Sequence, residues 1–359
     1  MSMIARLQLA RTRGIGPVSY RQLIQRFGDA VNALEALPNL AQRGGGRAIK
    51  VASRDAIVRE MEAVKQCGAS YIFCGDADYP RILGELSNAP TVLIAKGDAS
   101  LMARPMVAIV GARNASAAAC RFARMMGQGL GDAGFTVVSG LARGIDTAAH
   151  MGAMASGTIG VIASGIDVYF PPENRELQQK LASEHLVLSE YVPGTEPLAR
   201  QFPHRNRIIA GLSQGTLVVE AAPRSGSLVT ARLATEAGRE VMAVPGSPLD
   251  PRAQGCNGLI RDGATLIQSV DDIVEALRPV DARMVRQPPL AAFEALAAAD
   301  PGDDERARIV SLLGPVAVAV DELARQSAVA LASLQMILLE LELAGRLERH
   351  AAGRVSLIS

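Results

Sequence analysis

The chain has 359 residues, which exceeds the usual ceiling of about 250–300 residues for one hydrophobic core and excludes a single small binding module. Apolar residues make up 49% and charged residues 20%, a composition that excludes a disordered chain. Lys plus Arg number 37 and Asp plus Glu number 36, so the net charge of +1 excludes a cationic surface overall, and binding of a polyanion must depend on local clusters.

The cysteines and the short apolar runs restrict location and chemistry. Cys67, Cys74, Cys120 and Cys256 show neither CxxC spacing nor a neighbouring His cluster, so we expect no metal site and no disulfide framework. Arginines interrupt the N-terminal segment, and no run of about 18 uncharged apolar residues is present. We therefore expect a cytoplasmic protein that is neither exported nor membrane-spanning.

Residues 1–66 predict a small helical domain. Leu and Ile recur at near-helical spacing, and Gly or Pro stand at the breaks. The expected helices are ARLQLART (5–12), VSYRQLIQRFG (18–28), ALEALPNLAQ (33–42) and ASRDAIVREMEAVKQ (52–66).

Residues 67–280 predict a doubly wound, Rossmann-like α/β domain with a mostly parallel sheet. Short apolar runs alternate with helical stretches, and most runs are continuous, as expected of strands buried on both faces. The expected strands are VLIA (92–95), VAIVG (107–111), TVVSG (136–140), IGVIA (159–163), LVLSE (186–190), TLVVE (216–220), VMAVP (241–245) and TLIQS (265–269). The expected helices include FARMMGQGLGDAG (122–134), IDTAAHMGAMASG (145–157), ENRELQQKLASE (173–184), SLVTARLATEAG (227–238) and DDIVEAL (271–277).

The C-terminal part predicts a linker over 281–303 and a winged-helix-like domain over 304–359. Three helical segments precede two short strands around Ala351-Ala352-Gly353, which is the order of a winged helix. The expected helices are ERARIVSLLG (305–314), VDELARQS (320–327) and LASLQMILLELELAG (331–345).

The last of these helices is acidic where a DNA-reading helix is basic. It contains no Lys or Arg and carries Glu340 and Glu342, whose charge repels phosphate. We expect this domain to contact protein instead, although Arg346, Arg349 and Arg354 flank or occupy the wing.

The carboxyl ends of the expected strands form the candidate ligand site, because open parallel sheets bind ligands there. Glycines permit close backbone approach, and helix N-termini offer free N–H groups to an anion, so this rim is expected to bind phosphates. For any single loop, the glycines are as well explained as ordinary turn residues. Neither GxGxxG nor GxxxxGK[ST] is present, so no dinucleotide or ATP cofactor is expected. The rim residues are Gly111, Arg113, Ser139, Gly140, Arg143, Ser164, Gly165, Glu220, Pro245 and Gly246.

The segment QFPHRNRIIAGLS has the densest positive charge and no acidic residue. Arg205 and Arg207 are expected to fork onto phosphates, and Asn206 is expected to hydrogen-bond a base edge or sugar. Phe202 fits two interpretations equally, a stacking partner for a base or a plug in the core.

Two further helix starts contain polar candidates. Asp146 and His150 have the spacing of an acid/base pair, but we favour a capping acid and an ordinary helix-face histidine. Ser225 and Ser227 begin another helix and are expected to contact phosphate.

Six motifs together resemble one family. They are IVGARNAS, SGLARGIDTAAH, SGIDVYFPPEN, FPHRNRIIAGLS, EAAPRSGSLVTARLATEAGREVMAVPG and GCNGLIRDGA, in this order. They are similar to the signature blocks of the DNA processing protein A family (DprA, also called Smf), over roughly residues 75–270. GIGPVSYRQLIQRFG is similar to the sterile-alpha-motif-like or helix-hairpin-helix segment of many members. GARNAS departs from the Gly-Ser-Arg or Gly-Thr-Arg of many relatives but keeps Arg113.

The resemblance implies a non-enzymatic, single-stranded DNA-binding protein of natural transformation. Such proteins protect incoming DNA, displace or tolerate single-strand-binding protein, load the RecA recombinase and form homodimers through the Rossmann-like domain. The family's DNA-binding positions map here onto Arg113 and the block from Phe202 to Arg207.

The competing hypothesis is a nucleotide-processing enzyme. The domain type is also similar to phosphoribohydrolases, in which an acid and an arginine act on a nucleoside monophosphate; Glu220 with Arg113 or Arg143 would fill these roles. For self-association, the candidate residues are Leu259, Ile260, Leu266 and Ile267, with ordinary core as an equally good interpretation.

Overall fold

The chain divides into two compact units in the computed structural model, which describes residues 2–46, 49–278, 300–350 and 353–358. One unit is Glu60–Met284, and the other combines Met1–Arg59 with Val285–Ser359. Of the predicted linker over 281–303, residues 281–299 lie outside the described residues.

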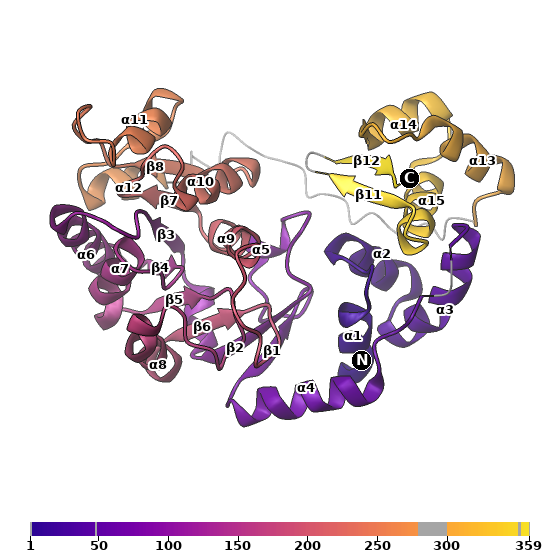
Figure 1. The fold of residues 1–359 in the computed structure, drawn as a ribbon, viewed down its shortest axis with the longest axis horizontal. Coiled ribbons are helices and arrows are strands. Elements are labelled where there is room, and N and C mark those ends of the chain that lie inside the picture. Colours follow the sequence, from indigo (N-terminus) through magenta and orange to yellow (C-terminus); the bar gives the residue numbers. More distant parts are fainter. Residues whose placement is uncertain (1, 47–48, 279–299, 351–352, 359) are drawn as a thin grey trace. The chain divides into compact units, whose positions relative to one another are not determined.

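A nine-stranded sheet forms the centre of the first unit (Figure 1). Its order is β1-β2-β6-β5-β4-β3-β7-β8-β9. The part β6-β5-β4-β3-β7-β8-β9 is parallel, and the β1–β2 and β2–β6 pairs are antiparallel. The strands are β1 (Ser70–Phe73), β2 (Val92–Gly97), β3 (Met106–Val110), β4 (Thr136–Ser139), β5 (Thr158–Val161), β6 (Leu186–Ser189), β7 (Gly215–Val218), β8 (Glu240–Ala243) and β9 (Thr265–Leu266).

Helices cover both faces of this sheet because its strands are apolar on both sides. In β2, for example, Leu93 and Ala95 enter one hydrophobic cluster, whereas Ile94 enters another on the opposite face. On the face of Leu93 lie α5 (Arg81–Gly84), α9 (Gln201–Leu212), α10 (Gly226–Glu236) and α11 (Gln254–Arg261). On the other lie α6 (Ala117–Asp132), α7 (Ile145–Gly152), α8 (Arg175–Glu184) and α12 (Val270–Ala276).

The Rossmann-like fold is confirmed, including all eight expected strands. The sequence did not indicate β1, a four-residue antiparallel edge strand. Its pattern SYIF is too short to distinguish from a turn, and only its last two residues are buried.

The second unit contains both ends of the chain. Its N-terminal part contains α1 (Met3–Arg11), α2 (Pro17–Phe27), α3 (Ala30–Arg43) and the start of α4 (Arg54–Gln66). Its C-terminal part confirms the winged helix, with α13 (Asp303–Leu312), α14 (Val320–Ser327), α15 (Leu331–Leu343) and a sheet of β10 (Val318–Ala319), β12 (Arg354–Leu357) and β11 (Leu347–His350). The two-residue β10 was not expected from the sequence.

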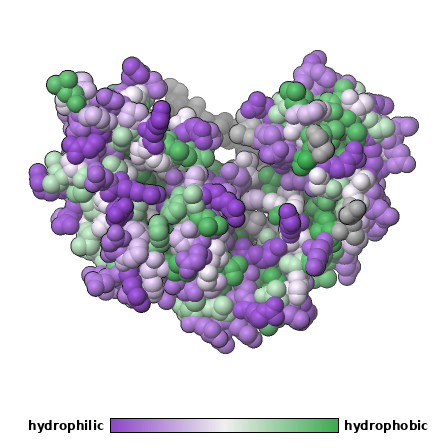
Figure 2. Space-filling view, in the orientation of Figure 1, coloured by the Kyte–Doolittle hydropathy of each residue, from purple (hydrophilic) through white to green (hydrophobic). Residues whose placement is uncertain are grey.

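Hydrophilic residues cover most of the visible face of the sheet-containing unit, and hydrophobic residues form small separate groups there (Figure 2). Among the described residues, no single helix is long and apolar enough to cross a membrane, and α14 and α15 pass that test only as a pair bent by 119°.

Candidate nucleic-acid interface

The candidate site lies at the carboxyl ends of the central parallel strands. The chain adds β4, β5 and β6 on one side of β3 and then β7, β8 and β9 on the other, so the strand order reverses between β3 and β7. Such a reversal opens a crevice between neighbouring βα loops. Close to it, a pocket of ≈ 350 Å³, counting its open mouth, is lined by Arg113, Gly140, Ala142, Arg143, Phe170, Pro171, Phe202 and Arg205.

Exposed arginines and two aromatic rings form the mouth of this pocket. The Arg113 guanidinium lies 5.3 Å from the centroid of the Phe202 ring, and the Phe170 ring lies 5.7 Å from that of Phe202. Arg143 is 3.5 Å from the Glu173 carboxylate in a loose pair in which both side chains are about 60% exposed. Cations beside partly exposed rings form a surface that suits a phosphate backbone with unstacked bases.

Two glycines let the β4–α7 loop approach its neighbours. A Cβ atom on Gly140 would lie 2.2 Å from Nη1 of Arg205 and 2.8 Å from the Asp146 carboxylate. Gly144 has φ of +75°, and its Cβ would lie 2.3 Å from the Ala112 carbonyl oxygen. Both glycines are therefore required by the packing of the loop against its protein neighbours, and close approach of Gly140 to a ligand stays a prediction.

Arg205 lies behind the pocket rather than on its open rim. It is 4% exposed, and its Nη1 donates to the carbonyl oxygens of Gly140, at 2.7 Å, and Val161. Burial lowers its pKa to about 10, so the guanidinium remains charged at neutral pH. The sequence interpretation treated Arg205 as a surface phosphate ligand, whereas this geometry braces the floor of the pocket.

Arg207 also points inward. It is 5% exposed and donates through Nη2 to both oxygens of Glu190, at 2.7 and 2.6 Å. Nδ1 of His204 lies 3.3 Å from the same carboxylate. Although burial alone would raise it, the pKa of Glu190 is lowered by the hydrogen bonds and charges of His204 and Arg207. No local pattern indicated this partner, because Glu190 follows β6, outside the basic segment.

Asp146 and His150 do not form an acid/base pair. The Asp146 carboxylate accepts from the backbone N–H of Gly140, at 3.1 Å, and of Ala142, at 3.3 Å. Nδ1 of His150 instead lies 2.8 Å from the Thr158 hydroxyl, which donates to a backbone carbonyl. Burial raises the pKa of Asp146 to about 6 and lowers the pKa of His150 to about 3. Asp146 holds the loop that contains Arg143.

These two buried groups predict opposite pH dependences of stability. A folded-state pKa of about 6 for Asp146 means that the free energy of unfolding falls as pH rises from about 4 to 6, whereas neutral, buried His150 makes it rise up to about pH 6.5. In the Asp146→Asn variant only the His150 contribution remains. We therefore compare the free energies of unfolding of the two proteins, measured in urea titrations. The value for the wild type minus the value for the variant is expected to fall by up to about 3 kcal/mol between pH 4 and pH 7. A difference that is constant with pH would contradict this.

Several of the remaining predicted residues already have structural roles within the domain. Ser139 is fully buried and donates to the Ile109 carbonyl oxygen at 2.6 Å, and Gly111 leaves room for Ile145 beneath the loop. Ser225 caps α10, and its hydroxyl lies 2.7 Å from that of Ser227, which is buried.

Asn206 links two helices beside the crevice. Its side-chain amide donates to the Gly226 carbonyl oxygen at 3.4 Å, which joins α9 to the start of α10. As a DNA ligand it stays a prediction, as do the other site residues. Sequence reasoning missed three pocket residues, Ala142, Phe170 and Pro171; the signal for Phe170 was an aromatic residue within the motif SGIDVYFPPEN.

Glu220 lies just after β7, and its carboxylate is already engaged. Its carboxylate accepts from the Ser116 backbone N–H at 2.8 Å and lies 3.8 Å from Arg252. It therefore holds the β3–α6 loop against the end of β7. Within the described ranges, no group of three or more His, Cys, Asp or Glu side chains is arranged to hold a metal ion.

The self-association candidates lie near the β9 edge of the sheet. Ile267 is buried in the hydrophobic cluster on one face of the sheet, Leu259 and Ile260 are partly buried against the cluster on the other face, and Leu266 is 44% exposed. A dimer through this region stays a prediction.

Comparison with known proteins places the whole arrangement in one family. The family model for DNA recombination-mediator protein A matches residues 70–278, and models for a DprA-like N-terminal HHH domain and a DprA winged helix domain match residues 2–63 and 293–353. DNA processing protein DprA of Streptococcus pneumoniae is 49% identical over 201 residues, which cover 55% of this chain and 71% of that protein.

Solved structures agree with these matches. The crystal structure of DprA from Streptococcus pneumoniae is similar with a TM-score of 0.64 and 37% identity, over 76% of this chain and 96% of that one. A structure that concerns the single-stranded DNA binding mode of DNA processing protein A from Helicobacter pylori has a TM-score of 0.54 and 28% identity, over 58% and 95% of the two chains. The resemblance inferred from the six motifs is confirmed: the chain belongs to the DNA recombination-mediator protein A (DprA/Smf) family.

Proposed function

We propose that this chain binds single-stranded DNA at the rim of its Rossmann-like domain. The observation that carries the proposal is the open pocket at which exposed Arg113 and Arg143 meet Phe170 and Phe202. Arginines at the mouth supply contacts to phosphate, and partly exposed rings supply stacking surfaces for bases that are not paired. The relative from Helicobacter pylori, with its single-stranded DNA binding mode, supports the same ligand.

We further propose that binding serves recombination and involves no catalysis. Family membership supports a role as recombination mediator. On this proposal the protein protects incoming single strands during natural transformation, loads the RecA recombinase on DNA that carries single-strand-binding protein, and acts as a homodimer. Two linked sites in a dimer gain avidity through effective concentration without any new contact.

The enzymatic alternative has less support. A hydrolytic Glu220 would need a free carboxylate facing the substrate, but Glu220 accepts a backbone hydrogen bond and lies near Arg252. Incubation with nucleoside monophosphates separates the two hypotheses, because release of free base would favour the enzyme.

Matched oligonucleotides test the binding proposal. In mobility-shift titrations at equal salt, the full chain is expected to bind a single strand more tightly than the blunt duplex of the same sequence, because the pocket accepts unstacked bases. Equal or tighter binding of the duplex would overturn the proposal. For the mediator role, the readout is RecA-driven strand exchange on DNA coated with single-strand-binding protein; no stimulation would refute loading even if binding were present.

A further inference from the structure

Helix α15 carries two apolar stripes, which is unusual for a helix that reads DNA. One stripe, with the spacing i, i+3, i+4, i+7, packs into the core of the winged helix itself. The second stripe packs instead among leucines of α1, α2 and α3. The first stripe is Leu334, Ile337, Leu338 and Leu341, and the second is Met336, Leu339 and Leu343. All seven side chains are at most 7% exposed.

Glycines at the end of α3 bring the two backbones close together. A Cβ atom on Gly44 would lie 2.1 Å from the Glu340 carbonyl oxygen, and one on Gly46 would lie 2.5 Å from the Cα atom of Ala344. Gly44 has φ of −70° and ψ of −2°, which any residue adopts without strain. Its lack of a side chain is therefore required by the approach of α15 and not by its own conformation.

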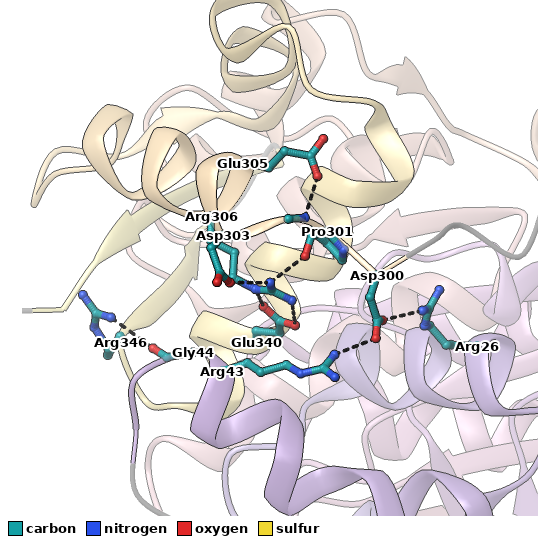
Figure 3. A network of polar contacts seen from close by, with 11 residues as sticks. Arg26, Arg43, Gly44, Asp300, Pro301, Asp303, Glu305, Arg306, Glu340 and Arg346 are labelled. Carbon is teal, nitrogen blue, oxygen red and sulfur yellow. Dashed lines mark hydrogen bonds and ion pairs between the residues drawn. The ribbon is translucent and has the colours of Figure 1, made fainter.

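Polar contacts surround this apolar contact (Figure 3). The Asp300 carboxylate accepts from Arg26 of α2 and from Arg43 of α3, both at 2.8 Å. Arg346, just after α15, donates to the Gly44 carbonyl oxygen at 3.0 Å. Contacts from both ends of the chain thus surround the end of α3.

The acidic residues of α15 are neutralised inside the winged helix. Glu340 is 1% exposed and forms a two-pronged pair with Arg306, at 2.8 and 2.9 Å (Figure 3). Glu342 accepts from Arg349 at 2.7 Å. These arginines are therefore occupied by carboxylates, and α15 itself contributes no cation toward a phosphate backbone.

We propose that α15 is a protein-docking helix whose partner is the helical domain α1–α3 of the same chain, and that this contact replaces DNA reading by the winged helix. The sequence predicted that the C-terminal domain contacts protein, and on this proposal that protein is the α1–α3 domain of the same chain. The two ends of the chain then fold and open as one unit, although more than 250 residues separate α3 from α13.

The Gly44→Ala substitution tests this in the full-length protein. Without docking, alanine at this position would leave the native state unchanged or slightly stabilise it by restricting the unfolded chain. With docking, the new methyl group displaces α15. We expect hydrogen exchange, followed by mass spectrometry, to accelerate at least tenfold in α1–α3 and in α14–α15 together, with α6–α10 unchanged. Acceleration confined to α3, or none, would overturn the proposal.

Two comparisons make the result specific. Gly314→Ala is the matched control, because its Cβ meets nothing within 4 Å, and it is expected to leave exchange within twofold. Asp300→Ala removes only the polar contacts of a half-exposed side chain, so this variant replaces Gly44→Ala as the test if Gly44→Ala fails to fold. We expect hydrogen exchange in Asp300→Ala to be about threefold faster in α1–α3 and in α14–α15. The affinity of the variants for a DNA duplex is expected to stay unchanged, and a tenfold gain on undocking would show that α15 reads DNA after all.

Discussion

Replacing Arg113 and Arg143 together by alanine is expected to weaken binding of a single-stranded oligonucleotide by about 100-fold. Each guanidinium lies at the mouth of the pocket, and a charge-assisted contact of about 1.5 kcal/mol corresponds to roughly tenfold in affinity. Because each phosphate contact on a single strand adds about 0.7 to the slope of log affinity against log salt, the slope should become shallower by about 1.4. Fluorescence anisotropy over a salt series measures both quantities.

The matched control also removes two positive charges, but at the amino ends of the strands. Arg104 lies just before the amino end of β3, and Lys180 lies in the second half of α8, which leads to the amino end of β6. Both side chains are exposed, and the variant Arg104→Ala with Lys180→Ala should bind within threefold of wild type. If the control loses as much affinity as the rim variant, binding depends on overall charge and the pocket is not the site.

The second large effect concerns Arg207, which the sequence interpretation assigned to phosphate. Arg207→Ala leaves the carboxylate of Glu190, which is only 16% exposed, without its main partner, and breaking a buried pair in this way typically costs about 3–5 kcal/mol of stability. We therefore expect a lower free energy of unfolding, measured in urea, with a salt slope of DNA binding that does not change. Arg232→Ala, which breaks an exposed pair on α10, should cost less than about 1 kcal/mol.

A paired substitution separates the two roles of Arg207. Replacing Arg207 and Glu190 together by methionine removes the charge and the need for a partner, so much of the stability should return. If Arg207→Ala instead leaves stability intact and lowers the salt slope, the side chain contacts phosphate as the sequence first indicated.

The sequence predicted the architecture well because its strands are buried on both faces. Runs such as VAIVG and TLVVE have no interpretation other than buried segments, and the glycines after them indicate the βα turns. β1 was missed because four residues at an edge carry little pattern. The two-residue β10 was missed for the same reason.

The structure has a pocket among several of the predicted site residues, at the carboxyl ends of the strands, but the sequence did not predict how deeply each side chain is buried. Arginines in a basic segment suggest a surface, yet Arg205 and Arg207 are buried, because their acceptors come from distant segments such as Gly140 and Glu190. No local pattern encodes such partners. Ser139 is buried for a related reason, since it ends a central strand.

The sequence of α15 contained a pattern that indicates its contact with the N-terminal helices. LASLQMILLELEL is apolar around most of its circumference, and a helix of that kind is buried on more than one side. The sequence indicated protein contact but could not say that the partner lay some 300 residues earlier.

The two outer strands of the large sheet limit how copies of this chain can join. β9 has two residues, and β1 has four. A second molecule that added its own strand beside β9 could form too few backbone hydrogen bonds for a stable pair of strands. Short edge strands of this kind also protect proteins from aggregation by strand addition. The self-association predicted at that edge would therefore depend on side chains such as Leu266, and its strength should respond to substitution of single apolar residues rather than to changes in backbone pairing.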